Sequence, residues 1–146
     1  PVRSLALGIV DSLVQILRAA VKEMFCWVTS KSQLTEGLFR AMALACISCL
    51  AEVSKSADGM AILEQDGELV FVLVGALQCD DSSLIEHATA CVGFLSVSQV
   101  LHKSLVAAHT HLLLLRQLLR DVHDMVEGVK DQFQSVRRRA LEGVQA

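Results

Sequence analysis

The six residues Ala45-Cys46-Ile47-Ser48-Cys49-Leu50 return later in the chain as Ala90-Cys91-Val92-Gly93-Phe94-Leu95, aligned without gaps at a spacing of 45 residues. In the second copy, apolar residues continue a helical pattern in three- and four-residue steps that begins at Leu84 and passes through Ala88. This spacing places them on one face of a helix, which predicts a helix with a buried side.

A second correspondence follows each block. Gly59–Leu63 leads into the apolar run Leu69–Leu77, just as Lys103–Ala107 leads into Leu112–Leu119, at a spacing of 42 to 43 residues. Each unit therefore has a polar break, a short helical stretch and a stronger one. A repeat length of a little over forty residues, with these three parts in this order, is typical of helical repeat proteins.

The pattern predicts an all-α protein. We expect Ser83 and Glu86 to form a capping box at the start of one helix. We also expect a longer connection over 22–34, which carries Trp27 and is long enough for a short extra helix. Residues 121–130 are amphipathic and could extend the helix before them. The predicted helices cover 4–22, 35–54, 57–66, 68–78, 82–97, 100–109, 111–121 and 131–144.

The composition excludes several classes of protein. The chain has 146 residues, of which 53% are hydrophobic and only one is Pro, so it is too apolar for intrinsic disorder and long enough for one domain with a core. Aromatic residues make up only 4%, which favours helices over sheets. A net charge of −3 and a pI near 5.9 argue against a dedicated nucleic-acid binder.

The chain also lacks obvious targeting features. Its longest uninterrupted apolar stretches, Leu69–Leu77 and Ala41–Ile47, are far shorter than the roughly 18–20 residues that span a bilayer. No signal peptide is visible, and the absence of an initial Met suggests that the chain begins inside a longer protein. Five cysteines, an odd number, indicate reduced thiols in an intracellular protein, cytoplasmic or nuclear.

The run Val70–Leu84 resembles the second helix, the acidic turn and the start of the third helix of an armadillo repeat, and Ala88–Leu95 resembles the rest of that third helix. HEAT repeats share the hydrophobic pattern. The resemblance implies a right-handed α-solenoid of about two and two-thirds repeats. A partial repeat would cover 4–54, a full repeat 57–97, and a final repeat with a charged capping helix 100–146.

Peptide-binding armadillo proteins hold an extended chain with asparagines, and often tryptophans, on their third helices. The corresponding asparagine positions here are Cys49 and Phe94, the tryptophan positions are Ala45 and Ala90, and the chain contains no Asn. The backbone clamp of that family is therefore absent. We expect instead a shallow apolar groove that takes an amphipathic helix or a domain face. Its predicted residues are Ala45, Cys49, His87, Ala90 and Phe94.

No catalytic motif or phosphate loop occurs, so we predict no enzyme activity and no cofactor. Cys46, Cys49, His87 and Cys91 could approach each other as zinc ligands if neighbouring helices stack. A C-x-x-C inside a helix nevertheless lacks the loop geometry of usual zinc sites. The preferred interpretation is that small thiols fill gaps between helices, with no metal bound.

Two other surfaces are candidates. The N-terminal helix is apolar on nearly every side, and we expect Leu13 and Leu17 to pack on a preceding repeat or on a second copy. The basic triplet Arg137, Arg138 and Arg139 spreads over roughly 200° of a helix, which suits solvent or an acidic protein partner better than nucleic acid. The sequence thus predicts an interaction scaffold. The alternative is a structural module that forms a homodimer through its N-terminal helix.

Overall fold

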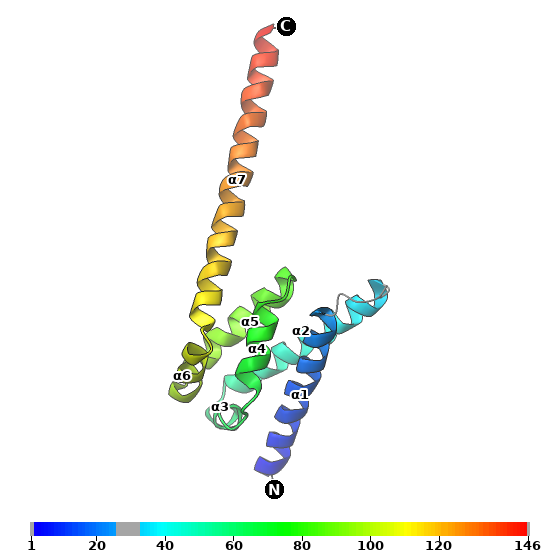
Figure 1. The fold of residues 1–146 in the computed structure, drawn as a ribbon, viewed down its shortest axis with the longest axis vertical. Coiled ribbons are helices and arrows are strands. Elements are labelled where there is room, and N and C mark those ends of the chain that lie inside the picture. The colour runs from blue at the N-terminus through cyan, green and yellow to red at the C-terminus, as the bar shows by residue number, and fades with distance from the viewer. Residues whose placement is uncertain (1, 26–32, 146) are drawn as a thin grey trace. The chain divides into compact units, whose positions relative to one another are not determined.

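The computed structural model describes residues 2–25 and 33–145, and every regular element in these two ranges is an α-helix. The chain divides into two compact units, a first unit of Pro1–His111 and a second unit of Leu112–Ala146. The helices are α1 (Val2–Phe25), α2 (Gln33–Ser54), α3 (Ala57–Leu63), α4 (Leu69–Leu77), α5 (Ser82–Leu95), α6 (Gln99–Ala107) and α7 (Thr110–Gln145). Figure 1 shows their course.

Helices α1, α2, α4 and α5 of the first unit pack in two pairs. Helices α1 and α4 contact each other and run in similar directions, while α2 and α5 contact each other and cross the first pair obliquely (Figure 1). Each member of one pair also contacts a member of the other, α1 with α2 and α4 with α5. The short helices α3 and α6 precede α4 and α7 in the chain.

The core lies between these two pairs. Its fully buried side chains recur at three- and four-residue steps along each helix, because that spacing returns a side chain to the same face. The largest are Val14 and Leu17 of α1, Ile47 and Leu50 of α2, Leu63 of α3, Leu69 and Leu73 of α4, and Leu84, Cys91 and Leu95 of α5.

Side-chain caps set the starts of three helices. Ser56 accepts a hydrogen bond from the Gly59 amide at the start of α3, and Ser98 accepts one from the Leu101 amide at the start of α6. The Asp81 carboxylate accepts from the Leu84 amide, 2.9 Å away, at the start of α5. The predicted capping box at Ser83 is therefore wrong: the cap is Asp81, whose β-region backbone directs its side chain at the free amides of the first turn.

Gly59 lies at a position where a side chain would clash with the backbone. It is buried in α3, and a Cβ at this position would lie 1.9 Å from the carbonyl oxygen of Val53. The last turn of α2 and the first turn of α3 thus approach so closely that no side chain fits between them.

The predicted helices from 57 to 109 agree with α3 to α6 within a few residues. The separate helices predicted over 111–121 and 131–144 are instead one continuous helix of 36 residues, α7. Residues 121–130 continue the helix because they contain no proline, and a single Gly128 costs only about 1 kcal/mol in a helix interior. Most of the predicted connection over 22–34, with Trp27, lies outside the described residues.

The turn between α6 and α7 contains the one positive φ that the structure describes at a non-glycine residue. His109 has a φ of 57° and follows Ala108, the C-cap of α6. Its backbone N–H donates to the carbonyl of Val106. A left-handed residue just after a helix ends it and satisfies its last carbonyls, a task that glycine performs most often.

Two segments are long and apolar enough to cross a membrane by length and composition alone, Arg3–Met24 of α1 and Gly37–Ser54 of α2. In each segment 28% of the residues are buried. Core helices of soluble proteins have the same length and composition. The expectation that the chain has no membrane span stays a prediction.

Candidate functional site

The exposed side of α2 and α5 carries all five residues of the predicted groove. Ala45 and Cys49 on α2, and His87, Ala90 and Phe94 on α5, are each exposed. The opposite sides of both helices are buried in the core. We call these five residues the α2–α5 face.

Two contacts define how α2 and α5 align. Near the start of α2, the Arg40 guanidinium lies 2.8 Å from the Asp81 carboxylate and donates to the Ser83 hydroxyl. Near its end, the Lys55 ammonium lies 5.5 Å from the centre of the Phe94 ring. The two helices therefore run parallel, and Ala45 and Cys49 lie beside the middle of α5.

The two ends of the α2–α5 face differ in chemistry. At one end, Phe94 is 42% exposed and the Lys55 ammonium approaches its ring, an attraction between the cation and the ring face. Lys55 also forms an ion pair with Glu52 at 2.6 Å. At the other end, Asp81 is mostly buried and holds Arg40 in place. An apolar anchor thus sits at one end and fixed charges at the other.

Small side chains lie between these ends. Ala45, Cys49 and Ala90 project little from their helices, and the ring Nδ1 of His87 lies 2.7 Å from the Ser83 carbonyl of its own helix. A flat surface of this kind admits the close approach of a second helix. Large apolar side chains of such a helix would reach between α2 and α5.

Burial raises the pKa of each of the three buried thiols. Burial raises the pKa of the Cys91 thiol to about 12, and burial followed by the nearby Asp81 charge raises that of Cys79 to about 11. Burial, with a smaller effect of Cys49, also raises the pKa of Cys46. Because the thiolate is the nucleophilic form of a cysteine, a raised pKa makes these thiols less reactive. Cys26 lies outside the described residues.

Within the described part of the chain, no group of three or more His, Cys, Asp or Glu side chains is arranged to hold a metal ion. The four candidate zinc ligands differ in burial. Cys46 and Cys91 belong to the core, while Cys49 and His87 belong to the exposed α2–α5 face.

The prediction for the N-terminal helix needs a correction. Leu17 is fully buried and Leu13 is half-buried, because α1 packs against α2 and α4. Leu17 is therefore part of the core rather than of a docking face. The exposed apolar side chains of α1 are instead Leu5, Ile9 and Ile16. A shallow depression on this helix is lined by Ser4, Leu5, Gly8, Ile9, Ser12 and Leu13.

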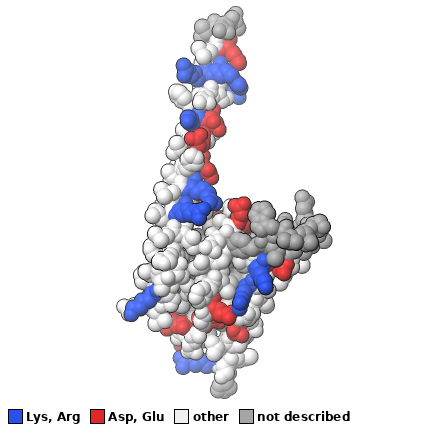
Figure 2. Space-filling view, viewed as in Figure 1, with Lys and Arg blue, Asp and Glu red and all other residues white. Residues whose placement is uncertain are grey.

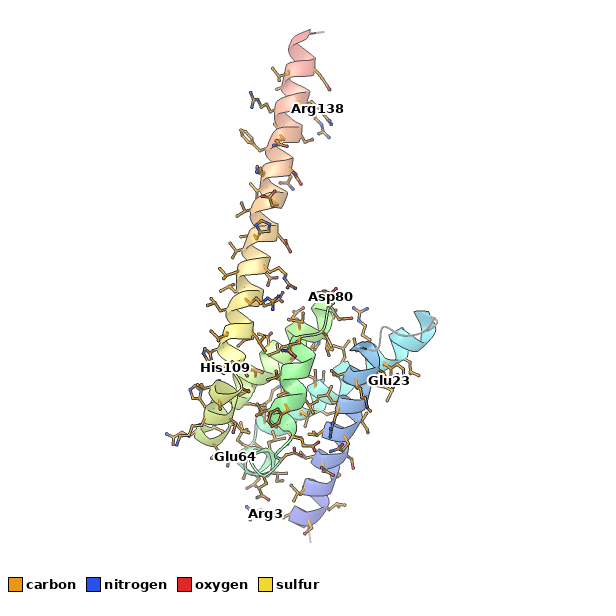
Figure 3. All side chains as sticks on the ribbon, viewed as in Figure 1. Arg3, Glu23, Glu64, Asp80, His109 and Arg138 are labelled. Carbon is orange, nitrogen blue, oxygen red and sulfur yellow. The ribbon has the colours of Figure 1, made fainter. Side chains whose placement is uncertain are left out.

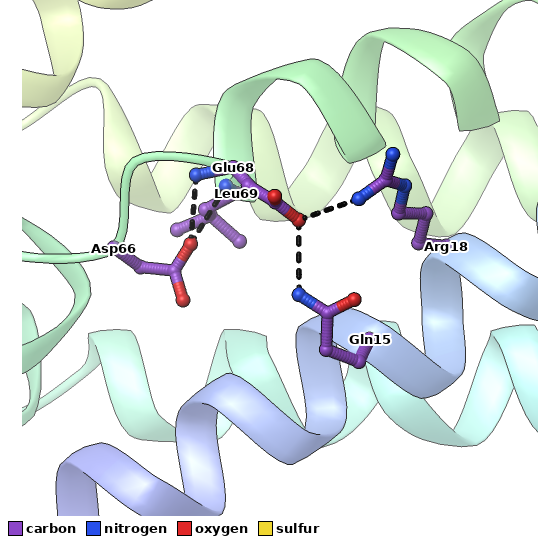
Figure 4. A network of polar contacts seen from close by, with 5 residues as sticks. All are labelled: Gln15, Arg18, Asp66, Glu68 and Leu69. Atoms are coloured by element: carbon purple, nitrogen blue, oxygen red, sulfur yellow. Dashed lines mark hydrogen bonds and ion pairs between the residues drawn. The ribbon is translucent and has the colours of Figure 1, made fainter.

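A polar network joins α1 to the start of α4 (Figure 4). One carboxylate oxygen of Glu68 accepts hydrogen bonds from Gln15 at 2.9 Å and from Arg18 at 3.0 Å. The Asp66 carboxylate accepts hydrogen bonds from the backbone amides of Glu68 and Leu69, where α4 begins. These groups are largely exposed, so the network orients α4 on α1 more than it stabilises the fold.

The basic triplet lies near the end of α7, where Figure 3 labels Arg138. All three arginines are exposed, and the Arg138 guanidinium lies 3.9 Å from Glu142. Figure 2 shows charged side chains of both signs along α7 and also on the visible face of the first unit.

Sequence reasoning missed two exposed apolar features. Phe71, on α4, is 74% exposed although its neighbours Val70 and Val72 are buried. Its run is apolar throughout, so no periodic signal marks the side that faces water. On α7, the apolar side chains from Leu118 to Leu141 are 43% to 69% exposed. The three- and four-residue spacing of these side chains was readable in the sequence.

No protein-family model, curated protein or solved structure matches the chain.

Proposed function

We propose that this chain is a non-enzymatic interaction scaffold, built as a right-handed armadillo- or HEAT-like α-solenoid, that binds a helix of another protein on its α2–α5 face. The contact pattern of the first unit supports the solenoid: α1 lies beside α4 and α2 beside α5, as equivalent helices do in stacked repeats. The order of a short helix followed by two longer ones, in α3, α4 and α5, supports it as well.

One observation carries the proposed site. The four residues at the asparagine and tryptophan positions of the repeat are all exposed, as is His87, on two parallel helices whose other sides are buried. Phe94 is the largest apolar group among them and lies at one end of the face. A large apolar side chain can anchor the apolar face of a docking helix.

The test uses amphipathic helical peptides of about 16 residues, selected from a displayed library on the purified chain. Affinities are then measured by fluorescence anisotropy for the wild-type chain, for Phe94→Asp and for the control Phe71→Asp, which alters an exposed phenylalanine on α4. We expect Phe94→Asp to weaken binding by about tenfold or more, because truncating an anchor costs over 1 kcal/mol. We expect Phe71→Asp to leave the affinity unchanged.

Two results would overturn this assignment. The first is a selection that yields no binding peptide. The second is an affinity that Phe94→Asp and Phe71→Asp reduce equally, which would indicate a general effect of added charge.

The second candidate function is a structural module that forms homo-oligomers through α1. The exposed Leu5 and Ile9 and the shallow depression beside them favour it. Light scattering over a range of concentrations, with reductant present, distinguishes this function from the first. An oligomer that Ile9→Asp dissociates supports self-association, whereas a monomer of 15.8 kDa excludes it.

A further inference from the structure

The apolar residues of α7 follow a strict heptad pattern, with steps of three and four residues in alternation over more than three heptads. Position a is occupied by Leu112, Leu119, Val126 and Phe133. Position d is occupied by Leu115, Val122, Val129 and Val136. All eight side chains are exposed, with exposed fractions between 43% and 69%. We call them the heptad stripe.

The geometry of the heptad stripe favours a helix, rather than a flat protein surface, as its binding partner. A straight helix has 3.6 residues per turn, so a strict seven-residue repeat drifts by about 20° per heptad. The heptad stripe therefore winds around α7 with a left-handed sense. A flat protein surface would meet only part of it, whereas a second helix in a left-handed coiled coil follows it along its whole length.

Charge is segregated around this stripe. The e positions beside it carry Arg116, His123, Lys130 and Arg137, and no acidic residue occupies an e or g position between 112 and 139. The five carboxylates of α7, Asp121, Asp124, Glu127, Asp131 and Glu142, all fall at positions b, c or f, away from the stripe. Lys130 lies 3.9 Å from Glu127, but both side chains are about half exposed or more, so this pair is weak.

We propose that α7 binds a partner helix whose own apolar heptad face is flanked by acidic residues. Residues at e and g set the choice of partner in coiled coils, because they meet across the interface. Glutamates on the partner would pair with Arg116, Lys130 and Arg137 while the two apolar faces close together. This surface is separate from the α2–α5 face, so the proposal does not depend on the function assigned there.

A second copy of this chain fits the stripe less well. In a parallel pair, the e residues of one helix meet g residues of the other, and none of the g residues here is acidic: Leu118, Met125, Gln132 and Arg139. In an antiparallel pair, the basic e positions face each other and repel. Neither arrangement places an acidic residue opposite the basic residues at the e positions.

The test uses the full chain and two synthetic peptides of about four heptads, with identical leucine and valine residues at a and d. One peptide carries Glu at every e and g position and the other carries Lys, so each repels itself and stays monomeric. Binding is measured by fluorescence anisotropy at about 50 mM and about 500 mM salt. We expect the acidic peptide to bind at least about tenfold more tightly than the basic one at low salt, with a smaller difference at high salt.

Charge reversal gives the sharpest version of the test. The triple variant Arg116→Glu, Lys130→Glu and Arg137→Glu should reverse the preference, so that the basic peptide binds more tightly. The matched control Asp124→Lys and Asp131→Lys changes charges on the opposite side of α7 and should retain the preference for the acidic peptide. Val126→Asp should abolish binding of both peptides, and Phe94→Asp should leave it unchanged.

Three outcomes would overturn the proposal: equal binding of the two peptides, no binding of either, or a preference that the triple variant retains. Self-association that Val126→Asp abolishes and that excludes the acidic peptide would also overturn it, since the occupant of the stripe would then be a second copy.

Discussion

The two units of this chain place their leucines in opposite environments. In the first unit, leucines such as Leu50, Leu73 and Leu84 are fully buried between paired helices. In the second unit, Leu118 and Leu119 are 58% and 62% exposed, although they belong to a helix of 36 residues. The first unit buries these leucines among its own helices, whereas the second leaves its large apolar side chains exposed.

The difference follows from the arrangement of apolar residues around each helix. On α4, apolar residues occupy every side, and most of them are buried by α1 and α5. On α7, they form a stripe with charged residues opposite, which suits one neighbouring helix and leaves the rest of the surface in water. A helix that is apolar all round needs several neighbours, whereas a heptad stripe needs only one.

The largest contrast is expected from truncating one leucine in each unit. Leu73→Ala should lower the free energy of unfolding by about 2 to 5 kcal/mol, since it leaves a cavity in a closed core. Leu119→Ala should change it by less than about 0.5 kcal/mol, because Leu119 is already exposed. Urea denaturation followed by circular dichroism measures both values. Similar losses in the two variants would show that α7 is packed as tightly as α4.

Glycine-to-alanine substitutions should have opposite effects on stability in the two units. Gly59→Ala places a methyl group against the Val53 carbonyl and should destabilise the fold by about 1 to 3 kcal/mol. Gly128→Ala, where nothing lies within 4 Å of the added Cβ, should stabilise α7 by about 0.5 to 1 kcal/mol. Thermal melts of the two variants compare these effects, and a stabilised Gly59→Ala variant would contradict the close approach of α2 and α3.

Substitution of Asp81 tests the polar contacts that cap α5 and align it with α2. Asp81→Ala removes both the cap of α5 and the ion pair with Arg40, and should cost about 1 to 2 kcal/mol. Asp80→Ala is the control, because Asp80 is exposed beside it. Chemical denaturation of both variants gives the difference. Equal stabilities would mean that the cap contributes nothing.

The smallest effect is expected at the turn before α7. His109→Gly should stabilise the protein by about 0.5 to 1 kcal/mol, because glycine adopts a φ of 57° without the steric cost that His109 carries. Ala108→Gly, at an ordinary negative φ, should destabilise it instead. Melting temperatures provide the readout, and a destabilised His109→Gly variant would be inconsistent with a left-handed residue at this position.

The sequence predicts the first unit well because its repeated blocks place apolar residues at helical spacing. That spacing locates α3 to α6 within a few residues and places the α2–α5 face on exposed positions. It does not identify the buried side of α1, because a helix that is apolar on nearly every side has no periodic signal. Leu17 is buried and Ile16 exposed only because α2 and α4 lie on one side of α1.

The prediction for the C-terminal segment was wrong for a different reason. The sequence predicts separate helices over 111–121 and 131–144, with the amphipathic residues 121–130 able to extend the first, whereas the structure has one continuous helix whose carboxylates lie away from the apolar stripe. Val122, Val126 and Val129 keep the heptad intact through this segment. A test for seven-residue periodicity across the charged stretch would have revealed α7.

Hydrogen exchange of the full chain, free and with the acidic-flank peptide, tests the central claim most directly. In the free monomer, we expect slow exchange in α2, α4 and α5 and fast exchange in α7 beyond Leu118, because no packed neighbour protects an exposed helix from opening. With the peptide bound, amides from 119 to 136 should become protected while the first unit stays unchanged. Slow exchange of α7 in the free monomer, or no gain in protection when the peptide binds, would contradict the account.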